Sequence, residues 1–495
     1  MMKKEKSEKF LARFYRGLIC VLPAVLFFSY YPVISLGASE SMNFEFSLPL
    51  IWLVVFDVLA MVIMVQRKLL FRDFKKKCVW LLFPGFLSLS LLWSLNFVRG
   101  FLTVGILWLV YFAVYAFFGL KSVLKEVGVK EIFWKVFFGS ALLVCGWCVL
   151  QCALDLWGVS RMGSLMCAGC TYEMFGFPHP NGFAIEPQFM GNLLLAPAIT
   201  SVWFVLKNKK YWWLFFIFVA TMFLTFSRGA IYAFIIAMIF MMVMEWTKQK
   251  DWKVCKTFLI IAAAFLFTLN LQGIMAQVSP TDDTYSSGVT KVINQLSLGI
   301  IDIRGDENET NEVILEETNT PVLKKTDENA KNEKEQAVFD GYVEESTETR
   351  KRLAGAAFTI WRQDFKTVMF GVGLGGAGQA LYANGLSPAP KEIVQNQYAS
   401  LLLETGVVGI GLLILTMVLV FRVVYKNKNS ILIFTLIVAY MVSLCFFSGL
   451  PNALHIYLLP AILMVILDGG KSWYRKWWRR GFCKIVEKIR DQRRK

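Results

Sequence analysis

The sequence predicts an all-α integral membrane protein of about twelve transmembrane helices, with both termini in the cytoplasm. Of its 495 residues, 56% are hydrophobic and 15% are aromatic, and the mean hydropathy is +0.52. The polar surface of a soluble domain dilutes its apolar content well below this level. Apolar runs of about 17 to 25 residues, long enough to cross roughly 30 Å of hydrocarbon as helices, recur along the chain. The segments that join these runs are alternately rich and poor in Lys and Arg, and this alternation sets the orientation of the helices in the membrane.

The predicted spans follow the apolar runs in chain order. They are 17–36, 48–65, 78–96, 101–118, 132–154, 189–206, 211–226, 230–246, 257–275, 404–421, 431–448 and 454–468. The first run has a second interpretation, because a basic stretch followed by apolar residues also describes a signal peptide. Leu36 is a poor residue three positions before a cut after Ala38, which favours a retained helix over cleavage of residues 1–38.

Basic residues crowd one side of the predicted bundle. The segments on that side hold 36 of the 52 Lys and Arg residues; they are 1–16, 66–77, 119–130, 207–210, 247–256, 422–428 and 469–495. Because lysine and arginine near span ends resist translocation, these segments are predicted to be cytoplasmic. The net charge of +16 therefore describes an inner surface that faces anionic lipid, and it does not indicate a nucleic-acid partner.

The loops divide the chain into four predicted parts. Residues 1–275 carry spans 1 to 9, 276–395 form one large extracytoplasmic loop, 396–470 carry spans 10 to 12, and 471–495 form a basic cytoplasmic tail. Within the large loop, 306–348 contains fourteen Asp and Glu residues against four Lys. Such a composition buries too little apolar surface to offset chain entropy, so it predicts disorder.

The loop segment 350–378 has a different pattern. Its apolar residues recur at helical spacing and predict an amphipathic helix; they are Leu353, Ala356, Ala357, Ile360, Trp361 and Phe365. The helix leads into a glycine-rich turn that includes GxGxxG from Gly371 to Gly376. This motif follows a helix rather than a strand, so we interpret it as a tight exit turn and not as a nucleotide site.

Cys167 and Cys170 form an external CxxC pair. A local disulfide is the favoured interpretation, because no second pair of ligands follows nearby and a zinc site needs one. We therefore predict neither a metal nor a cofactor.

Several arginines fall on the predicted outer side, which is otherwise poor in basic residues. Arg99, Arg161 and Arg228 lie in outer loops, and Arg350 and Arg352 open the large-loop helix. Guanidinium groups bind phosphate bidentately and stay charged at any working pH. We therefore expect a phosphate-bearing substrate at the outer leaflet. The alternative for Arg99 and Arg228 is that they only snorkel to lipid headgroups.

Other polar side chains on the outer side are candidates for proton transfer and substrate contact. His179 lies in the rigid sequence Phe-Pro-His-Pro-Asn and can serve as a base, and Glu186 competes for that role. Asn396 and Glu404 flank the start of the span after the large loop and are candidate substrate-binding residues. His455 begins the last span, where a histidine is more often a packing residue.

Four stretches in chain order carry a family resemblance. They are Arg161 with His179–Pro187, the Phe226–Gly229 hinge, Arg352 leading into Phe370–Gly373, and Asn396–Tyr398 with Leu401–Gly406. Together with twelve spans and one large outer loop in the second half, the pattern resembles the O-antigen polymerases and ligases of bacterial envelope polysaccharide assembly. The resemblance covers residues from about 80 to 465.

This resemblance implies a membrane glycosyltransferase of GT-C-like architecture that uses lipid-linked sugar as its donor. In the family an undecaprenyl-pyrophosphate oligosaccharide is the donor, and outer-loop arginines hold its pyrophosphate; Arg161, Arg228 and Arg352 match those positions. Alignment and charge stabilisation then supply most of the catalysis, without a metal. The resemblance also implies the bacterial cytoplasmic membrane, an active site facing outside, a lipid-linked acceptor, and a chain-length regulator as a candidate partner.

One departure from the family pattern bears on the reaction. Ligase-type members, which move finished polysaccharide onto a lipid acceptor, carry a histidine directly before the asparagine that corresponds to Asn396. This sequence has Gln395 there, which favours a polymerase that joins repeat units of O-antigen, capsule or exopolysaccharide. A histidine elsewhere, such as His179, keeps the ligase alternative open.

A transporter or lipid flippase is the alternative from another class. Such folds show two repeat-related halves, whereas here the large loop divides the predicted spans nine and three. The sequence leaves open the sugars, their linkage and the oligomeric state.

Overall fold

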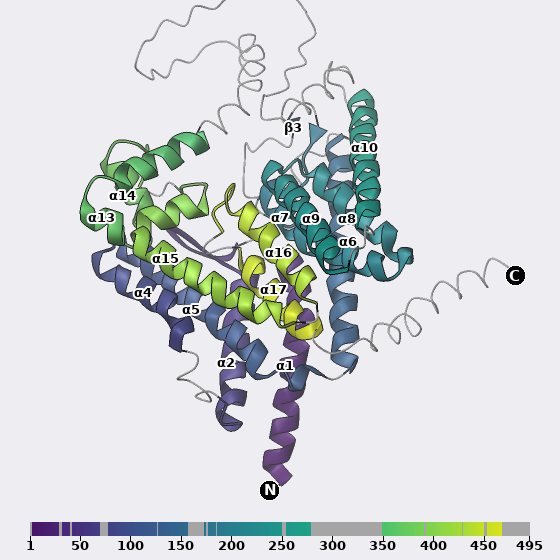
Figure 1. Ribbon diagram of the computed structural model, residues 1–495, viewed down its shortest axis with the longest axis horizontal. Coiled ribbons are helices and arrows are strands. Elements are labelled where there is room, and N and C mark those ends of the chain that lie inside the picture. The colour runs from purple at the N-terminus through teal and green to yellow at the C-terminus, as the bar shows by residue number, and fades with distance from the viewer. Residues whose placement is uncertain are drawn as a thin grey trace, which may run out of the picture.

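The computed structural model describes most of the chain outside the large loop and the C-terminal tail (Figure 1). The described residues are 2–28, 32–39, 42–69, 78–125, 127–156, 173–174, 177–184, 186–249, 254–278, 349–390, 393–427, 429–449 and 453–467. Four sequence predictions lie outside them: the placement of Arg161, the Cys167 and Cys170 pair, the acidic segment 306–348 and the basic tail 471–495.

Helices dominate the described residues. Those that overlap the predicted spans are α1 (Met2–Phe28), α2 (Leu48–Gln66), α4 (Leu82–Ser90), α5 (Phe97–Gly119), α6 (Val127–Leu156), α7 (Pro187–Lys207), α8 (Trp212–Leu224), α9 (Arg228–Gln249), α10 (Cys255–Val278), α15 (Gln397–Tyr425), α16 (Ser430–Ser443) and α17 (Leu454–Leu467). Short 3-10 turns flank some of them: η1 (Cys78–Leu81), η2 (Leu91–Trp93), η3 (Val123–Lys125) and η4 (Lys209–Tyr211). The prediction of a mainly helical protein is confirmed.

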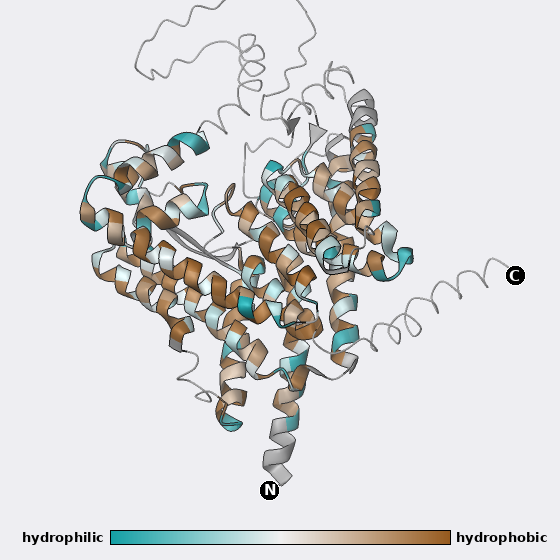
Figure 2. Ribbon diagram, viewed as in Figure 1, coloured by the Kyte–Doolittle hydropathy of each residue, from teal (hydrophilic) through white to brown (hydrophobic). Residues whose placement is uncertain are grey.

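Seven described helices are long and apolar enough to cross a membrane, which makes the chain an integral membrane protein. Apolar residues line the helices, and hydrophilic residues gather near many helix ends (Figure 2). The count of twelve spans stays a prediction, because α8, α16 and α17 have only 13, 14 and 14 residues. A straight helix needs about 20 residues to cross roughly 30 Å of hydrocarbon.

Two short antiparallel hairpins depart from the predicted all-α fold. Strand β1 (Pro32–Ser39) pairs with β2 (Met42–Ser47), so that Ile34 lies opposite Phe46. The prediction placed the end of a helix and a tight turn here, and α1 instead ends at Phe28. Proline fits poorly inside a helix but is tolerated as the first residue of a strand, and the β-branched residues after Pro32 favour strands. A second hairpin joins β3 (Glu173–Met174) and β4 (Phe177–Pro178).

The main hydrophobic core runs through the N-terminal helices, α6 to α10, α16 and α17. Aromatic rings fill its centre, with Trp134 packed edge to face on Phe204 at 5.1 Å. Glycine lets α7 approach α9 closely: a Cβ built on Gly191 would lie 2.8 Å from the Cβ of Ser227 and 2.9 Å from that of Ala230. This close packing fixes where α9 begins relative to α7.

A smaller core forms where the large-loop helices meet α15. A helix over 349–361 buries Leu353, Ala357 and Ile360 against α14 (Ala377–Ala383). The sequence predicted one amphipathic helix through Phe365, but Asp364 caps a separate helix, α13 (Phe365–Phe370), by accepting from the Thr367 amide at 2.9 Å. The direction of the chain changes at this cap, and Phe365 is therefore 78% exposed rather than buried.

Candidate functional site

The Phe226–Gly229 hinge brings Arg228 to the start of α9. Phe226 has a left-handed φ of 49°, which is uncommon for a residue with a side chain and costs backbone strain. Ser227 accepts from the Ala230 amide through its hydroxyl at 3.4 Å and so caps the first turn of α9. Gly229 lies so close to the α16–α17 connection that a Cβ would contact Phe446 at 2.8 Å. Packing on both sides therefore holds the hinge in its strained form.

Arg228 and Arg350 lie close enough for their charges to interact. Arg228 is half-buried at the first turn of α9, and it also interacts electrostatically with Tyr232 one turn later. Two guanidinium groups held near each other repel, and an anion bound between them offsets this repulsion. The pair is thus suited to a group with several negatively charged oxygens.

Two hydrogen bonds orient Arg350. Its Nε donates to Gln395 Oε1 at 2.6 Å, and its terminal amino group donates to Gln188 Oε1 at 3.2 Å. Gln188 is fixed in turn, because its amide donates to the Phe446 carbonyl at 2.7 Å. Arg350, which the sequence suggested only for substrate binding, thereby joins the loop helix to α7 and, through Gln188, to the α16–α17 connection. Arg352, matched by the family resemblance, is exposed on the same helix.

Glu186 supplies a carboxylate to this cluster. It stands at the N-cap of α7, two residues before Gln188, and its side chain keeps contact with solvent. The surrounding protein removes part of its hydration and raises the pKa of the carboxyl above its ordinary value, while the Arg350 guanidinium opposes that rise. A carboxylate with a raised pKa is a better proton acceptor, so Glu186 fits the predicted role of base.

His179, the competing base, is buried with 4% of its surface exposed. Its ring packs against Phe226 with 4.7 Å between centroids. The turn after it is held by Gln151 of α6, which accepts from the Gly182 amide at 2.9 Å and donates to the Gly182 carbonyl at 3.1 Å. His179 is thus buried against the hinge, which it helps to support, and does not lie at an open surface.

Asn396 and Glu404 occupy structural positions at the start of α15. Asn396 is the N-cap, and its side-chain oxygen accepts from the Tyr398 and Ala399 amides, each at 3.0 Å. Glu404 accepts from the Ala377 amide at 3.4 Å and interacts electrostatically with Arg99 of α5. The structure thus brings Arg228, Arg350 and Glu186 together and places Arg99 with Glu404 in a second cluster.

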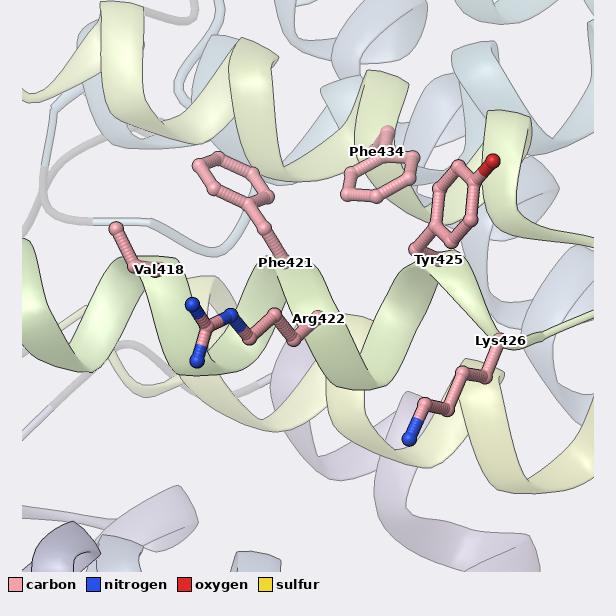
Figure 3. A pocket seen from close by; sticks show the side chains of 6 residues that line it. All are labelled: Val418, Phe421, Arg422, Tyr425, Lys426 and Phe434. Carbon is pink, nitrogen blue, oxygen red and sulfur yellow. The ribbon is translucent and has the colours of Figure 1, made fainter.

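A mainly apolar groove with two basic residues at its edge lies at the opposite end of α15. Its lining residues are Val418, Phe421, Arg422, Tyr425, Lys426 and Phe434, and in Figure 3 the Arg422 and Lys426 side chains extend to the same side of the helix. The groove has no carboxylate, histidine or hydroxyl nucleophile apart from the phenol of Tyr425. It lies at the predicted inner side, at the opposite end of α15 from Gln395, which holds Arg350. Among the described residues, no three His, Cys, Asp or Glu side chains are placed to hold a metal ion.

Sequence reasoning missed several residues that build the cluster. Gln188 and Tyr232 carry no charge and belong to no motif, so nothing in the sequence singles them out. Arg350 had a signal: it precedes Leu353 by three residues and Ala357 by seven, which places it beside the buried face of its helix. Arg352 is rotated about 100° away from Leu353 and faces outward.

Comparison with known families identifies one match. Residues 213–414 match the family model described as O-antigen ligase (Wzy_C), from α8 into α15. This part of the chain is thus similar to the O-antigen polymerase and ligase family, as the sequence predicts. Comparisons with curated proteins and with solved structures gave no match.

The similarity to this family bears directly on the cluster. O-antigen ligase family members are glycosyl-transfer enzymes that act on lipid-linked polysaccharide substrates in the membrane. The matched residues include the hinge with Arg228, both arginines of the loop helix, and the start of α15. Glu186, His179 and Arg99 lie before the matched region.

Proposed function

We propose that the protein is a polysaccharide polymerase that joins undecaprenyl-pyrophosphate-linked repeat units at the outer face of the bacterial cytoplasmic membrane. The observation that carries the proposal is the Arg228 and Arg350 pair beside Glu186. Two guanidinium groups match the charge of a pyrophosphate, and a carboxylate next to them can take the proton of an attacking hydroxyl.

The reaction follows from this arrangement. The acceptor hydroxyl oxygen forms a bond to the anomeric carbon of the donor, and the bond from that carbon to the pyrophosphate oxygen breaks. The hydroxyl proton passes to the Glu186 carboxylate, and the electron pair of the broken bond stays with the leaving lipid pyrophosphate. Arg228 and Arg350 stabilise the negative charge that grows on this leaving group, which is the larger contribution to rate. No step requires a metal.

Gln395 supports polymerase over ligase chemistry. Its side chain holds the Arg350 guanidinium at 2.6 Å, at the position where ligase-type relatives carry a histidine. A side-chain amide does not ionise near neutral pH, so this position orients an arginine and does not supply an acid or a base. A ligase-type transfer to a lipid or wall acceptor is the second candidate, because the matching family model is described as O-antigen ligase.

Arginine-to-lysine variants test the proposal. Arg228→Lys and Arg350→Lys keep the charge but lose the planar fork, so we expect each to lower polymerisation roughly 100-fold, the scale of removing one transition-state donor. In cells, single lipid-linked repeat units should accumulate and the ladder of longer chains should disappear. Arg422→Lys on the far end of α15 is the matched control and should leave the ladder intact.

A normal ladder from both variants would contradict the proposal, since the guanidinium pair would then bind no donor.

The product class separates the two candidate reactions. Purified protein given only lipid-linked repeat units should form longer lipid-linked chains if it is a polymerase. Transfer that occurs only when a different lipid acceptor is added would instead identify a ligase.

A further inference from the structure

Helix α15 is interrupted at Gly406, about two and a half turns after its start, and a loop satisfies the backbone groups freed there. Gly406 has a left-handed φ of 61°, which breaks the helical hydrogen-bond pattern at this point. The carbonyls of Leu403 and Glu404 accept instead from the amides of Val372 and Gly373, each at 2.9 Å. Backbone groups at membrane depth must find partners inside the protein, so the break and the glycine-rich turn depend on each other.

The Glu404 side chain extends this junction. Its carboxylate accepts from the Ala377 amide at 3.4 Å and from the Gly375 amide, and it faces the charge of Arg99. Arg99 lies in the first turn of α5, so its charge comes from a different part of the bundle. One carboxylate therefore links α15, the glycine-rich turn and α5.

The turn is also fixed to the segment that precedes α5. Ser94 donates through its hydroxyl to the Leu374 carbonyl at 2.7 Å, and the Leu95 amide donates to the Val372 carbonyl at 3.2 Å. Glycine is required at these contacts, because a Cβ on Gly373 would overlap the backbone of Ser94, one on Gly375 would overlap the backbone of Gly100 in α5, and both glycines have left-handed φ.

A continuous set of contacts leads from Glu404 to Arg350. Ala377, whose amide Glu404 holds, is the first residue of α14. Leu381 of α14 is fully buried in the same small core as Leu353 of the loop helix. Arg350 lies one turn before Leu353 in that helix. The position of the Arg350 guanidinium is thus set by where α14 is docked.

We propose that Arg99 and Glu404 are positioning residues, which dock the glycine-rich turn and α14 and so hold the helix that presents Arg350 to the donor. The inference rests on the proposed function for its catalytic consequence, but the docking itself does not. It replaces the expectation that Arg99 and Glu404 each bind substrate.

Hydrogen exchange on the full-length protein tests the docking without any substrate. Glu404→Gln keeps the size of the side chain and removes its charge, so we expect the amides of 371–383 to exchange roughly tenfold faster or more. Arg99→Leu should give the same change, and Arg99→Lys should restore slow exchange because only the charge is needed. Unchanged exchange in Glu404→Gln would overturn the proposal.

Activity of the double variant separates positioning from substrate contact. If the two residues act as one pair, Arg99→Leu should lower polymerisation in the wild-type background and cause less than a twofold further loss in Glu404→Gln. Losses that multiply would mean that each residue contacts substrate by itself, which would overturn the proposal. Arg99→Lys should retain activity, in contrast to Arg228→Lys. Should Arg228→Lys also retain activity, the proposed function would fail while the exchange result still stood.

Discussion

Gly191→Ala tests whether the contact between α7 and α9 sets the position of Arg228. The added Cβ would lie 2.8 Å from the Cβ of Ser227 and 2.9 Å from that of Ala230, whereas ordinary carbon contacts are about 3.5–4.0 Å. The two helices must therefore separate by up to about 1 Å. Overpacking of this kind costs about 1–3 kcal/mol. Replacing glycine inside a helix gains about 0.5–1 kcal/mol, so overpacking should prevail and the variant should be less stable.

The catalytic effect should exceed the effect on stability. Ser227 immediately precedes Arg228, and a shift of about 1 Å in a group that aligns a reaction can cost about 100-fold in rate. We expect Gly191→Ala to lower polymerisation by roughly that factor while the protein still purifies as a folded species. The assay is ladder formation from lipid-linked repeat units, read beside the thermal unfolding midpoint of the same preparation.

Gly146→Ala is the matched control for this prediction. Gly146 lies in α6, and a Cβ there would meet nothing within 4 Å, so the substitution should leave activity unchanged and stability equal or slightly higher. If Gly191→Ala behaved like Gly146→Ala in both assays, the close approach of α7 and α9 would not govern Arg228. The hinge would then need another explanation.

Two further predictions concern the base and the orientation of the chain. Burial raises the pKa of Glu186 above its ordinary value of 4.5, so kcat/KM should fall as the pH drops through that raised pKa and the carboxylate takes up a proton. Glu186→Gln should lower the rate at neutral pH and abolish this fall. If the variant kept the same fall at acid pH, another group would be responsible for it. Single cysteines at Ser41 and Ser287, in a background without native thiols, should react with an impermeant maleimide added to intact cells, and one at Ser472 should not; labelling at 472 would reverse the predicted topology.

The sequence was informative about where helices lie and about which residue types matter. Each predicted span overlaps a helix of the structure. Apolar runs are informative here because a helix that crosses the hydrocarbon layer must be long and apolar. Guanidinium groups on the side poor in basic residues pointed to Arg228, which lies in the cluster. The helical phase around Leu353 also contained the information that Arg350, and not Arg352, lies beside the buried face.

Long-range pairings were beyond sequence reasoning. Glu404 and Ala377 are 27 residues apart, and Gln188 and Arg350 are 162 residues apart, so no local pattern links them. The left-handed conformation of Phe226 is imposed by packing on both sides and contradicts the preference of the residue itself. Glu404 and Arg99 were identified as charged groups in unusual places, but only the tertiary structure shows that they face each other.

The shortness of α8 has a consequence for the bilayer. Thirteen residues rise about 20 Å, whereas the hydrocarbon layer is roughly 30 Å thick. A helix of this length that starts at one interface ends about 10 Å short of the other, and Arg228 follows it after only three residues. The residues from Phe218 to Leu224 are buried against neighbouring helices, so protein rather than lipid covers the short end of α8 and the bilayer need not thin beside Arg228.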